Sequence, residues 1–152
     1  MIEFIFSVRP DQGDPTGFDL GDMLCVGDSG EETSSGKSPD QGMMIYISVA
    51  QLLAELSSFF EAPGVKALRY TGVDTSFGLT FRRKARKSIS VAGAGGIFTE
   101  ADEVDLAESA LRAAEEFSAA HVSQLPANDA AYQDYQAALA QFRRIVSQRT
   151  RN

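Results

Sequence analysis

The chain has 152 residues, 43% of them hydrophobic and 23% charged, so it can bury a hydrophobic core as one domain without a disulfide. Its single cysteine excludes an internal disulfide bond. The formal net charge of −7 argues against general nucleic-acid binding, which depends on neutralising phosphates, and it permits a basic protein partner.

The N-terminal residues 1–4 have no basic region and no long apolar run, so we expect no signal peptide. No part of the chain approaches the ~18 consecutive apolar residues of a membrane helix. We therefore expect a cytoplasmic protein that does not associate with a membrane.

The first predicted strand is residues 2–9, in which apolar and polar side chains alternate. Residues 11–42 follow as a long acidic loop rich in Gly, Asp and Ser, with short strand pieces at 18–20 and 23–26. A loop of this length is uncommon in a compact domain. It is either a mobile functional loop or a tolerated surface excursion.

Residues 43–92 are the predicted central unit, which opens with a strand at 43–47. A helix then begins at Ser48, because Ser48 and Gln51 match a capping box, and it ends before Pro63. Three strands in a meander follow, at residues 66–71, 76–84 and 88–92.

The glycines of residues 92–96 predict a flexible hinge before the C-terminal part. A second capping box at Thr99 and Asp102 predicts the start of a helix, and Pro126 separates this helix from a last one. Both helices carry apolar residues at three- and four-residue spacing, so residues 99–148 predict an antiparallel helix hairpin.

These elements predict an α+β fold in a single domain over residues 1–152. We expect an antiparallel sheet of four or five strands, one helix covering it, and the C-terminal antiparallel helix hairpin. Apolar surface left on that hairpin would allow a homodimer.

Three short strings resemble functional motifs but lack the remaining residues. Residues 36–38 match the end of a phosphate-binding loop, but the first glycine of that pattern falls on Glu31. Residues 27–30 match the tetrapeptide around a serine-protease nucleophile, but the only histidine, His121, lies far downstream. Residues 93–98 lack the last glycine of a dinucleotide fingerprint.

Metal and cofactor sites find no support either. One cysteine and one histidine cannot make a structural zinc site, and the acidic residues of 11–42 lack EF-hand spacing. We therefore predict no metal, no cofactor and no catalytic residue. Cys25 lies in an apolar run and His121 on an apolar helix face, so we interpret both as packing residues.

One charge feature stands out, the basic tip of residues 82–87. Five cations in six residues could bind an acidic partner or a phosphate group. The predicted partner-binding residues are Arg82, Arg83, Lys84, Arg86 and Lys87. Alternatively, these cations protect a hairpin turn from edge pairing, or they pair with the acidic helix of residues 100–116.

The helix opened by Ser48–Leu53 and the meander through Phe77–Phe81, over residues 43–117, are similar to many small uncharacterised bacterial α+β proteins. Some of those are immunity proteins that neutralise a paired toxin. The resemblance implies a binding protein without catalysis, and it carries no site residues onto this chain.

The sequence thus favours a non-enzymatic protein-binding module of immunity type, which acts through its acidic surface or residues 11–42. Two alternatives stay open. The first is an enzyme of unrecognised class with a pocket beside residues 11–42. The second is a structural or assembly subunit that uses the helix hairpin.

Overall fold

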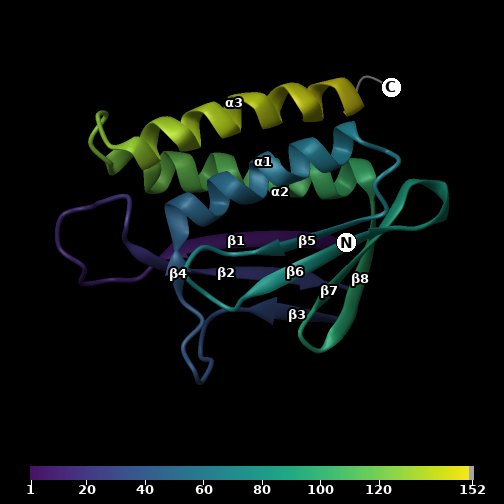
Figure 1. The fold of residues 1–152 in the computed structure, drawn as a ribbon, viewed down its shortest axis with the longest axis horizontal. Coiled ribbons are helices and arrows are strands. Elements are labelled where there is room, and N and C mark those ends of the chain that lie inside the picture. Colours follow the sequence, from purple (N-terminus) through teal and green to yellow (C-terminus); the bar gives the residue numbers. More distant parts are fainter. Residues whose placement is uncertain (151–152) are drawn as a thin grey trace.

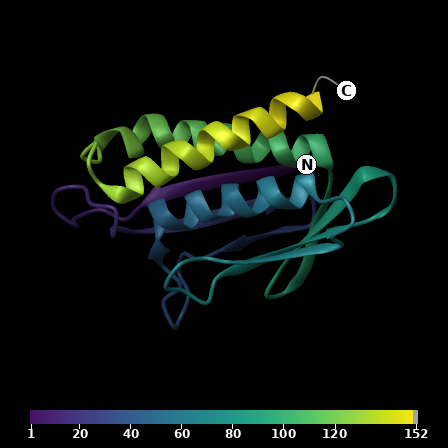
Figure 2. The ribbon, with the colours of Figure 1, turned by 45° about the horizontal axis from the view of Figure 1, so that its top comes forward.

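Two four-stranded antiparallel sheets lie on one side of three long helices (Figures 1 and 2) in a computed structural model that describes residues 1–150. The predicted α+β class is confirmed. The prediction of one sheet of four or five strands is wrong, because the strands divide into two sheets.

Sheet A contains β1 (Ile2–Val8), β2 (Leu20–Gly27), β3 (Gly30–Thr33) and β4 (Met43–Met44). The first three strands are neighbours in chain order, and β4 pairs with the start of β2. Alternate residues of β1 are buried, as the sequence pattern predicts for a strand with one covered face.

The prediction of one long loop over residues 11–42 is wrong, because β2 and β3 lie within this range. Its remaining segments are tied to the sheet by Arg9, whose guanidinium donates to Asp22 at 3.0 Å and to Asp40 at 2.7 Å. The glycines and aspartates of β2 weaken its alternating pattern, so that propensity alone favours a loop.

Sheet B is a meander of β5 (Ala67–Thr71), β6 (Gly78–Arg83), β7 (Ser88–Gly93) and β8 (Gly96–Asp102). Its first three strands confirm the predicted meander. A short 3₁₀ turn, η1 (Ala85–Lys87), joins β6 to β7.

The fourth strand of sheet B replaces the predicted hinge. Gly93 pairs with Gly96, and the latter has φ +109°, so the glycines form a tight hairpin turn between β7 and β8. Thr99 is buried within β8, so it does not cap a helix. The cap is Asp102, whose side chain accepts from the Val104 amide at 2.8 Å.

Helix α1 (Ile45–Glu61) begins three residues before the predicted cap at Ser48. Ser48 is buried inside the helix, and its hydroxyl accepts from the Val73 amide at 2.9 Å. The predicted capping box is therefore wrong, whereas the predicted end before Pro63 is confirmed. The apolar face of α1 is fully buried, including Leu52 and Leu56.

Helix α2 (Glu103–Ala120) covers β1, the turn η2 (Val122–Gln124) follows, and α3 (Ala130–Thr150) runs back beside both other helices (Figure 1). Helix α3 packs against α1 more extensively than it packs against α2. A separate C-terminal hairpin and a single covering helix are therefore not confirmed. No helix within residues 1–150 combines the length and the apolar character needed to cross a membrane.

The two sheets meet where β2 and β3 turn beside β8. The Ser29 amide donates to the Phe98 carbonyl at 3.0 Å, and the Thr99 hydroxyl donates to the Met1 carbonyl at 2.9 Å. Glu32 of β3 accepts from the Ala94 amide at 2.5 Å. These bonds attach the edge of sheet B to sheet A.

Candidate functional site

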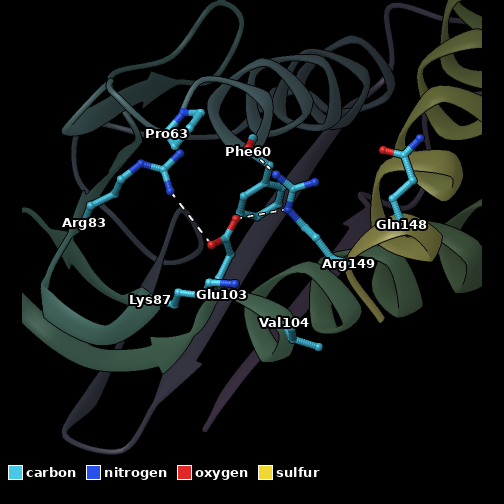
Figure 3. Close-up of a pocket in the computed structure, with 8 residues that line it drawn as sticks. All are labelled: Phe60, Pro63, Arg83, Lys87, Glu103, Val104, Gln148 and Arg149. Atoms are coloured by element: carbon cyan, nitrogen blue, oxygen red, sulfur yellow. Dashed lines mark hydrogen bonds and ion pairs between the residues drawn. The ribbon is translucent and has the colours of Figure 1, made fainter. Parts of the chain in front are cut away.

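The basic tip lies at the end of the molecule where several elements terminate. The C-terminal ends of α1 and α3, the first turn of α2 and the β6–β7 connection surround a cavity of about 340 Å³ (Figure 3). The residues that line it are Phe60, Pro63, Arg83, Lys87, Glu103, Val104, Gln148 and Arg149.

Glu103 is the one carboxylate in this cavity, and two arginines from distant elements converge on it (Figure 3). Nε of Arg149 lies 3.0 Å from its carboxylate, and Nη1 of Arg83 lies 4.0 Å from it. The side chains of Arg83 and Glu103 are only 14% and 13% exposed. This ion-pair cluster is therefore largely shielded from water, where each charge depends on its partners.

The same two arginines hold the C-terminal end of α1. Arg83 donates to the Val65 carbonyl at 2.8 Å and to the Phe59 carbonyl, and Arg149 donates to the Phe60 carbonyl. The two guanidinium groups lie 4.2 Å and 5.2 Å from the ring centroids of Phe59 and Phe60. These contacts satisfy carbonyls that the helix end leaves without partners, so both arginines have a structural role.

The structure divides the five predicted partner-binding residues. Arg83 points into the cavity and Lys87 lines its wall. Arg82 is exposed on the opposite face of sheet B, because side chains alternate along β6. Lys84 and Arg86 are exposed in the connection between β6 and β7.

Lys84 and Lys87 also share a second, adjoining cavity of about 220 Å³, which has Pro63 and Ser88 among its other walls. Within residues 1–150, neither lysine has an ion-pair partner, and the same holds for Arg82 and Arg86. The predicted pairing of the basic tip with the acidic helix is thus limited to Arg83 and Glu103.

The backbone of the tip is strained. Arg86 has φ 62° and Lys87 has φ 60°, and both values lie in the left-handed region that residues with a Cβ atom rarely adopt. Two consecutive residues in this conformation turn the chain sharply and direct it into β7. The tip therefore presents its lysines and arginines from a defined turn.

The sequence did not predict that two members of the ion-pair cluster, Glu103 and Arg149, belong to a site. Acidic residues in the first turn of a helix and basic residues in the last turn have an ordinary explanation in the helix dipole. The two residues are 46 positions apart, and only the path of α3 back to the end of α1 brings them together.

Electrostatically, the cavity carries an excess of positive charge. Three cations line it, Arg83, Lys87 and Arg149, against the single carboxylate of Glu103. The first turn of α2 adds little to this charge, because the side chain of Asp102 caps it and Glu103 and Asp105 lie within it. The arrangement favours an anionic group such as a carboxylate at its mouth, beside Lys84 and Lys87.

The other candidate residues have packing roles. Cys25 is completely buried. This burial, and to a lesser extent the nearby charge of Glu32, raises the pKa of its thiol well above its usual range. The ring of His121 lies 5.3 Å from that of Phe117, at the end of α2. Neither of the two cavities at the basic tip has a wall from residues 11–42.

Comparison with family models, with curated proteins and with solved structures finds no match to the chain.

Proposed function

We propose that this protein is a non-enzymatic protein-binding module whose basic tip docks an acidic segment of another protein. One observation carries the proposal: Lys84, Arg86 and Lys87 project, without ion-pair partners among residues 1–150, from a strained turn at the mouth of a positively charged cavity. Unpaired cations around a cavity attract carboxylates and accelerate association.

The overall negative charge does not oppose such a contact. Salt screens charges beyond about 8–10 Å, so the local excess of cations at the tip decides which partner approaches it. The neutralisation of a paired toxin, which the sequence resemblance suggests, is one activity that a module of this kind would perform.

The test is a titration with a glutamate-rich peptide at low salt, followed through the backbone amide signals in NMR. We expect shifts concentrated at residues 84–88 and at Glu103 and Val104. The double variant Lys84→Glu/Lys87→Glu should lose affinity about tenfold or more.

The matched control is Lys37→Glu/Arg144→Glu, which changes the net charge equally at exposed sites elsewhere. An equal loss of affinity in both double variants would show that only net charge matters and would overturn the proposal. Absence of peptide binding to the unmodified protein would overturn it as well.

A second candidate function is self-association, and it is favoured at β1 rather than at α2 and α3. The apolar stripe of α3 is buried, including Tyr135, Leu139 and Phe142, so it leaves little surface for a partner. In contrast, β1 is an edge strand, and Ile5 on its outer face is 46% exposed.

The pairing of β1 with β2 defines which backbone groups face its open edge. The backbone amide of Arg9 donates to the Leu20 carbonyl, so the backbone groups of alternate residues from Glu3 to Arg9 point toward β2. The backbone N–H and C=O groups of Phe4 and Phe6 therefore point toward the open edge, although their side chains are buried. Antiparallel pairing of two copies about Ile5 would join Phe4 of one copy to Phe6 of the other. Self-association should therefore depend on Ile5, and Ile5→Lys should convert a dimer seen by light scattering into a monomer. A monomer at all concentrations would exclude this candidate.

A further inference from the structure

A second groove lies between α1 and β5, apart from the acidic-partner site at the basic tip. It has a volume of about 380 Å³, and its walls include Ala54, Ala62, Val65 and Leu68. Small alanine side chains leave it open, and Val65 is 47% exposed beside it. Figure 2 shows α1 above the strands of sheet B.

Strand β5 forms the open edge of sheet B, since it pairs with β6 alone. The Lys66 carbonyl accepts from the backbone amide of Arg83 at 2.8 Å, and the Gly72 amide donates to the Phe77 carbonyl at 3.0 Å. In an antiparallel ladder, alternate residues share this direction, so Leu68 and Tyr70 also face β6.

The intervening residues, Ala67, Arg69 and Thr71, therefore turn their backbone N–H and C=O groups toward the open edge. These groups form no hydrogen bond with another part of residues 1–150. Such an edge accepts an additional strand by backbone pairing.

Glu55 of α1 gives the groove a charge. Its Oε2 atom is buried and accepts no hydrogen bond within residues 1–150, and the carboxylate has no ion-pair partner there. A buried acceptor without a donor is costly, and the neighbouring walls are apolar. Glu55 is itself a wall of the groove, so a cationic side chain that enters the groove would pair with its carboxylate.

We propose that an extended segment of a partner protein adds to β5 as a further strand of sheet B and places a lysine or arginine against Glu55. Side chains of the added strand point alternately toward α1 and away from it. The residues next to the basic one would therefore lie on the face that carries Arg69. There an acidic or neutral side chain is favoured over a second basic one.

The test uses a peptide of about seven residues, within the usual length of a strand. It has a central lysine, a glutamate on each side, and then a valine on each side, so that lysine and both valines share the face toward α1. A matched peptide carries norleucine in place of lysine. We expect the lysine peptide to bind about tenfold more tightly and to slow hydrogen exchange of the Arg69 amide.

Two variants locate the contact. Glu55→Gln should remove the preference for lysine over norleucine, whereas Glu61→Gln, at the exposed end of α1, should keep it. Arg69→Pro removes an outward-facing amide that the fold does not use, and it should abolish binding of both peptides while the circular dichroism spectrum is retained.

The Lys84→Glu/Lys87→Glu variant separates this site from the basic tip, since it should bind the lysine peptide as the unmodified protein does. Loss of binding in that variant would place the peptide at the tip and overturn the inference. Equal affinity for the lysine and norleucine peptides would overturn the role of Glu55. If hydrogen exchange of the Arg69 amide is not slowed in the bound state, or if neither peptide binds, the proposal of strand addition is overturned.

Discussion

At the scale of single residues, the basic tip combines exposed charge with an unfavourable backbone. A left-handed conformation costs a residue with a Cβ atom roughly 1–2 kcal/mol, and Arg86 and Lys87 adopt it in succession. Strained residues persist where the surrounding structure imposes them, and they concentrate at binding sites. Strain at the tip therefore accords with a role in binding.

Replacing Arg86 by glycine should relieve this strain. We expect Arg86→Gly to raise the free energy of unfolding by about 1 kcal/mol, because the left-handed conformation costs glycine little. Urea unfolding measures the change. The control is Lys84→Gly: Lys84 has φ −114°, so glycine there should lower stability. A destabilised Arg86→Gly protein would show that the side chain is needed for folding.

Glu103 has the opposite character, since its charge is required by the fold. Glu103→Gln should lower the free energy of unfolding by about 1–3 kcal/mol, because the shielded guanidinium groups of Arg83 and Arg149 lose their carboxylate. The matched control is Asp105→Asn, an exposed acid in the same first turn. Equal losses in both variants would attribute the effect to the helix dipole alone.

At the scale of secondary-structure elements, the start of α2 decides where sheet B ends. The Asp102 side chain caps the helix directly after β8, so strand and helix follow without a loop. We expect Asp102→Ala to lower stability by about 1 kcal/mol in urea unfolding. Glu100→Ala, in β8 and exposed, serves as the control. No difference between these two variants would contradict the capping role of Asp102.

Strands β1 and β2 carry a pH-dependent contact. The hydrogen bond from Arg9 holds the pKa of Asp22 below the ordinary aspartate value of about 3.9. Because the folded chain has the lower pKa, this contact contributes fully above about pH 4 and is lost as pH falls through the folded pKa.

The Asp22→Asn variant should therefore lose less stability than the unmodified protein when pH is lowered from about 7 to about 3. Urea unfolding at the two pH values measures the difference. Asp14→Asn, at an exposed position, should keep the full pH dependence. An unchanged pH dependence in Asp22→Asn would show that other carboxylates dominate the acid response.

At the scale of the whole molecule, the junction between the two sheets depends on Glu32. Its carboxylate accepts from the Ala94 amide, and it packs so closely on Gly93 that an added Cβ atom would collide with it. Glu32→Ala should lower stability by about 1–3 kcal/mol, because the Ala94 amide loses its acceptor.

Hydrogen exchange separates this loss from a general effect. The Ala94 amide should exchange faster in Glu32→Ala, whereas Glu31→Ala, at the exposed neighbouring position, should leave it unchanged. Protection of Ala94 in both variants would mean that the junction is held by the other bonds, from Ser29 to Phe98 and from Thr99 to Met1.

Local patterns in the sequence were sufficient for much of the secondary structure. Alternation predicted β1, three-and-four spacing predicted α1 and the two C-terminal helices, and the meander of β5 to β7 followed from strand patterns and turns. Each of these signals depends on residues a few positions apart. The basic tip was likewise visible as a cluster of charges in the sequence.

The tertiary structure decided the rest. Ser48 and Thr99 resemble helix caps locally, but their hydroxyl groups bond to Val73 and Met1, 25 and 98 positions away. Division into two sheets, the meeting of Glu103 with Arg149, and the position of Glu55 beside an open strand edge also depend on distant contacts. A local pattern ranks the conformations of a short segment, whereas the free energy of burial and pairing selects among them only when the whole chain is assembled.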